Sequence, residues 1–146
     1  MSTTTANNFA APATAGAAQD TLALLGRVLI ALLFVPAGFG KIAGFAGVVG
    51  YIGAVGLPLP QLGAVIAIAV ELGLGLLLLV GYKTRIVSII LAVFTVATAV
   101  FFHNYWAMPA DKAYINQLMF FKNIAIAGGL LAIAALGAGR FSIDRK

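Results

Sequence analysis

The chain has 146 residues, of which 62% are hydrophobic and 9% are charged, and its mean hydropathy is +1.08. Soluble domains carry about 25% charged residues, so this chain cannot surround a core with a water-exposed surface. The composition excludes a water-soluble enzyme, a nucleic-acid-binding protein and a disordered protein. It predicts an all-α integral membrane protein, and since one span needs about 20 residues, the length accommodates one membrane domain of four spans.

Four long apolar runs follow a polar N-terminal stretch. Residues 1–20 are rich in Ala, Thr, Ser and Asn, and we expect a disordered tail there because they carry too little bulky apolar surface to pack. Residues 21–146 form the predicted membrane domain. The predicted spans cover about residues 21–39, 61–80, 86–102 and 115–136.

The apolar segment at residues 42–55 is only 14 residues long and dense in glycine, so it is too short to cross a bilayer. Gly56, Pro58 and Pro60 end it. We expect a short interfacial or re-entrant helix after the first span.

The basic residues predict the orientation in the membrane. With four spans, five of them share the side of the two termini and two lie on the other side: Lys83, Arg85, Arg140, Arg145 and Lys146 against Lys41 and Lys112. Basic residues are enriched on the cytoplasmic side, so both termini are predicted to be cytoplasmic. A fifth span would place those five residues outside. An aromatic belt of Tyr105, Trp106 and Tyr114 is then expected at the outer interface.

Three charged residues fall inside the predicted spans: Arg27, Glu71 and Lys122. Ionisable groups at membrane depth are costly and usually face the bundle interior. The helical rise places Lys122 roughly 10 Å, Glu71 roughly 15 Å and Arg27 roughly 18–20 Å below the outer surface, so both basic groups are expected within reach of Glu71.

Rows of small residues support that interior placement, because membrane helices approach closely along such rows. The rows are Ala23–Arg27–Ala31 on the first span, Gly63–Ala67–Glu71–Gly75 on the second and Lys122–Ala125–Gly129–Ala132 on the fourth. The three charges could form a structural ion network that fixes helix assembly. The alternative is a polar pocket for a proton, a quinone head group or a small anion; before any resemblance is considered the structural network is preferred, and the neighbouring Asn123 faces about 100° away from Lys122.

No metal or haem site is predicted. The chain has no cysteine and a single histidine, so thiolate ligands and paired axial histidines are absent. We interpret His103 as an interfacial anchor, with a proton-relay role as the alternative.

Several motifs, taken in order, resemble those of the DoxX family of small bacterial inner-membrane proteins. They are Arg27 with Phe34-Val35-Pro36-Ala37-Gly38-Phe39-Gly40-Lys41, Gly56-Leu57-Pro58, Glu71 with Gly81-Tyr82-Lys83-Thr84-Arg85, Phe120-Phe121-Lys122-Asn123 with Gly128-Gly129-Leu130-Leu131, and Gly139-Arg140-Phe141-Ser142-Ile143-Asp144. The resemblance covers about residues 21–146.

The resemblance implies a four-helix inner-membrane protein that serves as an accessory subunit of a quinone-linked redox or oxidative-stress complex. It adds weight to a quinone site formed by Arg27, Glu71, Lys122 and Asn123, and implies redox-complex subunits as partners. A purely structural assembly protein without a cofactor is the alternative, with a homo-oligomer as its partner state. A small transporter is a third hypothesis, against which stands the absence of an obvious inverted repeat or interrupted helix pair.

Overall fold

The computed structural model describes residues 13–145, and within them every regular element is helical. In chain order the elements are α1 (Ala13–Ala43), α2 (Phe45–Ala54), α3 (Pro60–Ile68), the π-helical segment η1 (Ala69–Leu74), α4 (Gly75–Val80), α5 (Thr84–Phe102), the short 3₁₀ helix η2 (Tyr105–Ala107) and α6 (Ala110–Leu136). Four stretches are long and apolar enough to span a membrane: Gly16–Ala43, Pro60–Val80, Thr84–Ala107 and Ala110–Leu136. The predicted all-α, four-span architecture is confirmed.

The expected disordered tail is wrong for residues 13–20, which form the first two turns of α1. Four of these eight residues are alanine, the strongest helix former. Asp20 is also held in place, because its Oδ1 accepts a hydrogen bond of 2.9 Å from the backbone N–H of Arg140. Residues 1–12 of the expected tail lie outside the described residues.

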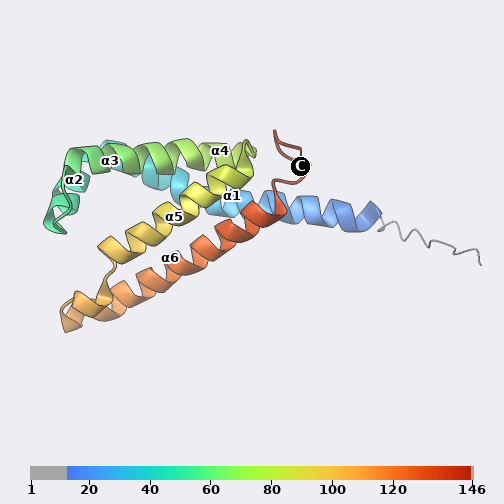
Figure 1. Ribbon diagram of the computed structural model, residues 1–146. Helices are drawn as coiled ribbons and strands as arrows, with labels where there is room; N and C mark the ends of the chain where they lie inside the picture. The colour runs from blue at the N-terminus through green and yellow to red at the C-terminus, as the bar shows by residue number, and fades with distance from the viewer. Residues whose placement is uncertain (1–12, 146) are drawn as a thin grey trace, which may run out of the picture.

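The two ends of the bundle differ in how closely the helices approach one another (Figure 1). We call the end where α1 begins and α6 ends the terminal end, and the end that carries α2 and η2 the distal end. At the terminal end α1, α4, α5 and α6 lie together. Toward the distal end the α5–α6 pair diverges from α1 and α3, and α3 makes no close backbone contact with α5 or α6.

The helix α2 is the short apolar helix expected after the first span, and it packs against α3 at the distal end. Its buried side chain, Ile52, lies against Gly63, where an added Cβ would be 3.4 Å from the Ile52 methyl groups. Two left-handed residues reverse the chain between the helices, Gly56 at φ 80° and Leu59 at φ 52°. Only glycine adopts that conformation at little cost, which explains Gly56.

A close approach between α1 and the second span joins the first half of the fold. A Cβ added at Gly38 would lie 2.8 Å from the backbone N of Leu72, and one added at Gly75 would lie 3.1 Å from Phe34 Cβ. Apolar side chains from every span fill the interior beside these contacts, among them Phe34, Leu78, Leu91 and Leu130. Glycine therefore allows the two helices to pack backbone to backbone, as small residues do in membrane proteins.

Candidate functional site

Arg27 is fully buried, with 0% of its surface exposed, but it does not pair with Glu71. Its guanidinium donates to three backbone carbonyls: Leu78 O at 3.3 Å, Leu79 O at 2.9 Å and Phe141 O at 2.6 Å. The expected approach of Arg27 to Glu71 is therefore wrong. The helical rise gives depth along a span but not which neighbouring atoms a side chain meets.

The end of α4 explains why a buried guanidinium lies there. The last four carbonyls of a helix lack intrahelical donors. Gly81, at φ 69°, makes the typical left-handed ending, in which Gly81 N donates to Leu78 O and Tyr82 N donates to Leu77 O. Arg27 supplies the donor for Leu79 O, and Ile143 N donates to Val80 O at 3.1 Å. Every one of the four carbonyls thus has a donor.

The C-terminal segment completes this arrangement by folding back across the terminal end. The Asp144 carboxylate accepts from the backbone N–H groups of Lys83 (2.9 Å) and Thr84 (2.8 Å), where α5 begins. Asp144 N in turn donates to Gly81 O. We call Arg27 with residues 139–144 the terminal clasp. It joins α1, α4 and α5, so Arg27 has a structural role in the clasp rather than a place beside Glu71.

Glu71 lies in the π-helical segment η1 and pairs with Lys41. The prediction that the first span ends at residue 39 puts this lysine outside the membrane. Glu71 Oε2 accepts from Lys41 Nζ at 2.6 Å, and Glu71 is 8% exposed. α1 continues past Phe39 to Ala43, so Lys41 belongs to the helix, and its long stem reaches inward. The predicted interior row of Glu71 is confirmed, since Ala67 and Gly75 are buried with it. π-helical turns occur frequently at functional sites.

Lys122 departs from its prediction in a different way, because it is exposed together with Ala125 and Ala132 of its row. The face of α6 that packs inward is instead Ala127, Leu130, Ile133 and Ala134. The Lys122 ammonium contacts Met119 Sδ at 3.2 Å, and Asn123 Nδ2 reaches Thr98 Oγ1 at 3.5 Å. Row spacing alone could not tell which face of α6 meets α5.

Lys41, Glu71, Lys122 and Asn123 nevertheless line one cavity, which lies where the α5–α6 pair diverges from α1 and α3. Its volume is about 480 Å³, and most of its wall is apolar. The lining residues are Leu33, Phe34, Ala37, Lys41, Val48, Tyr51, Ile52, Leu57, Gly63, Ile66, Ala67, Glu71, Phe94, Thr95, Ala97, Thr98, Phe101, Phe102, His103, Lys122 and Asn123. Pockets of roughly 300–1,000 Å³ with a few placed polar groups are typical small-molecule sites.

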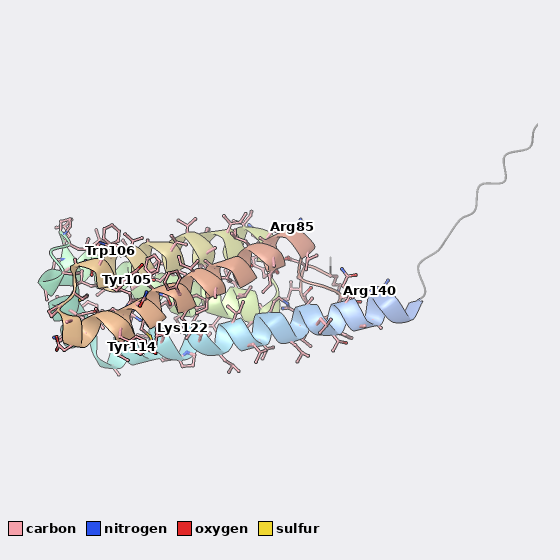
Figure 2. The ribbon with its side chains drawn as sticks, turned by 90° about the horizontal axis from the view of Figure 1, so that it is seen from below. Arg85, Tyr105, Trp106, Tyr114, Lys122 and Arg140 are labelled. Atoms are coloured by element: carbon pink, nitrogen blue, oxygen red, sulfur yellow. The ribbon has the colours of Figure 1, made fainter. Side chains whose placement is uncertain are left out.

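The charged and aromatic side chains are distributed along the bundle (Figure 2): Arg85 and Arg140 lie toward the terminal end, Tyr105, Trp106 and Tyr114 toward the other, and Lys122 between them. Trp106 and Tyr105 pack edge-on against Phe120. His103 Nδ1 lies 3.2 Å from Asn116 Oδ1. Within residues 13–145, no three acidic, histidine or cysteine side chains gather as a metal site would require.

Comparison with known proteins places the chain in a family. The family model described as DoxX matches residues 22–104. The chain belongs to the DoxX family. It is 39% identical to inner membrane protein YphA of Escherichia coli over 131 residues, which is 90% of this chain and 94% of YphA. It is 42% identical to inner membrane protein YqjF of the same organism, over 87% of this chain and 92% of YqjF.

A shorter likeness extends to a eukaryotic protein. The ER-derived vesicles protein ERV29 of Saccharomyces cerevisiae is 36% identical over 67 residues, which is 46% of the DoxX chain described here and 22% of ERV29. No solved structure gives a significant match. The matched family region contains Arg27, Lys41 and Glu71, so the clasp arginine and the ion pair both fall within it, while Lys122 and Asn123 lie beyond it.

Proposed function

We propose that this DoxX protein is an accessory membrane subunit of a quinone-linked redox or oxidative-stress complex, and that its cavity holds the quinone head group. The observation that carries the proposal is the 480 Å³, mostly apolar cavity with the partly buried ion pair Lys41–Glu71 in its wall. A carboxylate buried at membrane depth, as Glu71 is, is costly to maintain unless it serves assembly or a site.

The polar groups of the cavity suit a quinone, whose two carbonyl oxygens accept hydrogen bonds. Lys122 and Asn123 are donors on α6, and Lys41 is a donor on α1 whose position is held by Glu71. The apolar remainder of the wall suits an isoprenoid chain. The chain has no cysteine, so in this proposal the partner subunit supplies the electron-transfer centre and this chain supplies binding and position.

Equilibrium binding of decyl-ubiquinone to the purified full chain tests the quinone site. The double variant Lys41→Met/Glu71→Gln removes both charges together, so neither is left buried alone, and we expect it to weaken binding at least tenfold. Lys112→Met, an exposed lysine near the start of α6, is the matched control and should bind as the wild type does. Wild-type protein that does not bind decyl-ubiquinone, or a double variant that binds normally, refutes the site.

Partner identity needs a separate experiment, because quinone binding alone does not establish a redox complex. Gentle detergent extraction from the native membrane, followed by mass spectrometry, should recover a dehydrogenase or oxidase subunit together with quinone. Recovery of this chain with neither one contradicts the accessory-subunit proposal.

A structural assembly protein is the second candidate, and the Lys41–Glu71 pair favours it in one respect. The pair links α1 to the second span beside the Gly38–Leu72 contact, so it could serve packing alone. In that case the double variant lowers thermal stability, no quinone binds to any form, and the surviving protein still assembles with its partner.

We further propose that both termini are cytoplasmic. Lys83, Arg85, Arg140 and Arg145 all belong to the terminal end, whereas Lys112 begins α6 at the other end. This asymmetry follows the positive-inside rule. Because the chain has no cysteine, a single cysteine at Arg85 or at Lys112 can be labelled in intact cells with an impermeant maleimide. Labelling at position 112 and protection at position 85 is the expected result, and the reverse pattern refutes the orientation.

A further inference from the structure

The charges that line the cavity do not balance. Lys41 and Glu71 form an ion pair at 2.6 Å and neutralise each other. Lys122 is the remaining cation in the wall. The cavity therefore carries at least one net positive charge.

Among residues 13–145, which include all four acidic side chains, no carboxylate pairs with Lys122. The chain has four acidic residues. Glu71 pairs with Lys41, and both Asp20 and Asp144 bind groups of the terminal end. The fourth, Asp111, lies eleven residues before Lys122 on α6, or about 16 Å along the helix axis. Within residues 13–145 the one hydrogen-bond partner recorded for the ammonium is Met119 Sδ, and a thioether is a weak acceptor.

The position of Lys122 makes this lack of an acceptor significant. It lies twelve residues into α6, about 18 Å from the start of the helix, and eight residues beyond the aromatic Tyr114. A lysine at membrane depth is costly unless it meets a counter-charge, an acceptor or water. Asn123 and Thr98 also line the cavity, so further hydrogen-bonding groups accompany the ammonium.

The size and lining of the cavity limit what the counter-charge can be. About 480 Å³ fits one drug-sized molecule, and the apolar wall from Phe94, Phe101 and Ile66 suits a hydrocarbon chain. A free inorganic anion would leave that wall unfilled. The complement of the cavity is thus a single-chain amphipath with a negatively charged head.

We propose that the cavity selects a single-chain amphipath with an anionic head, such as a carboxylate, and that Lys122 is the residue that binds this head. The proposal rests on the cavity being the ligand site of the proposed function, but it assigns a charged head where a quinone has a neutral one. In this proposal Lys122 determines the preference for an anionic head, whereas the Lys41–Glu71 pair would contact a quinone and an anionic amphipath alike.

A matched pair of fluorescent probes tests the role of charge. Dansylaminoundecanoic acid and its methyl ester share one chain and differ in the charge of the head. Trp106 is the only tryptophan of the chain and packs against Phe120, two residues before Lys122. Energy transfer from Trp106 to the dansyl group therefore measures binding to the full chain in nanodiscs of zwitterionic lipid, at a pH that keeps the carboxylate ionised.

Wild-type protein should bind the acid at least tenfold more tightly than the ester. Lys122→Met should bind the two probes equally, Lys122→Arg should retain the preference, and the control Lys112→Met should behave as the wild type. Since Lys122 is exposed, its replacement leaves the packed interior unchanged. Equal binding of acid and ester by the wild type, or a preference that survives in Lys122→Met, overturns the proposal.

Competition identifies the source of the anionic head. Unlabelled laurate should displace the acid probe, and displacement by the single-chain lysophosphatidylglycerol as well assigns the site to a lipid head group. Failure of both competitors overturns the proposal. The quinone hypothesis is judged separately. Binding of the acid probe without binding of decyl-ubiquinone rejects the quinone and retains the anionic ligand. Binding of decyl-ubiquinone without binding of the acid probe retains the quinone and rejects the anionic ligand.

Discussion

Replacing Arg27 with methionine should weaken the terminal clasp without touching the cavity. The guanidinium is fully buried and donates to Leu79 O and Phe141 O at 2.9 and 2.6 Å. Leu78 O would keep a donor in the variant, because Gly81 N also donates to it. The substitution therefore leaves two carbonyls without donors, while the methionine side chain retains most of the apolar stem.

The magnitude follows from those two carbonyls. A buried acceptor left without its donor costs about 1–3 kcal/mol, and these two carbonyls, which are only partly buried, should lie toward the lower part of that range. Removing the buried charge also removes its desolvation cost, which offsets part of this loss. We expect the free energy of unfolding to fall by about 2–4 kcal/mol. For a chain of this length, 1 kcal/mol corresponds to roughly 2–4 °C in Tm, so a loss of about 3 kcal/mol lowers Tm by roughly 6–12 °C.

Thermal unfolding of the purified full chain in detergent measures the effect. Arg85→Met is the matched control, since Arg85 is an exposed arginine near the same end (Figure 2) and should change stability by less than about 0.5 kcal/mol. The folded fraction of Arg27→Met should bind decyl-ubiquinone with wild-type affinity. A Tm within about 2 °C of the wild type refutes the stabilising role of the terminal clasp. If the folded variant binds decyl-ubiquinone more weakly than the wild type, Arg27 contributes to the quinone site after all.

Three further predictions concern packing and pairing. Gly38→Ala places a methyl 2.8 Å from Leu72 N and should cost about 1–3 kcal/mol by overpacking, measured as a lower Tm; an unchanged Tm contradicts the close approach. Asp144→Ala removes two bonds at the start of α5 and should cost about 1 kcal/mol in the same assay, whereas no loss would show that α5 does not need this cap. Lys41→Met leaves Glu71 buried alone and should cost about 3–5 kcal/mol, part of which Glu71→Gln restores; simple additivity in this double-mutant cycle excludes a direct interaction.

The membrane class and the four spans could be predicted because they depend on composition and run length, which are local properties of the sequence. Two of the three small-residue rows are also correct: Arg27 and Ala31 are buried, as are Ala67 and Glu71. Such rows report the packing face of a helix directly. The DoxX motifs identified the family for the same reason, since they are read along the chain.

The partners of the charged residues could not be predicted in this way. Depth counting predicts that Arg27 lies near Glu71. The C-terminal segment that binds Arg27 instead folds back across the bundle, and hydrophobic periodicity in the sequence does not predict where such a non-helical segment lies. The predicted first span ends at Phe39, which places Lys41 outside the membrane and away from Glu71. The one available signal was its place at the end of the motif Phe34–Lys41, which carries the family resemblance.

The uneven closure of the bundle gives it a mechanical property. α5 is 19 residues long, or about 28 Å, and Asp144 holds it at the terminal end. Rotating α5 by about 5° about that fixed end displaces its other end by about 2.4 Å, enough to widen or narrow the cavity by a large part of an atomic diameter. Membrane helices change their tilt when the hydrocarbon layer changes thickness. If α5 tilts in this way about its fixed end, the width of the cavity changes with the thickness of the bilayer.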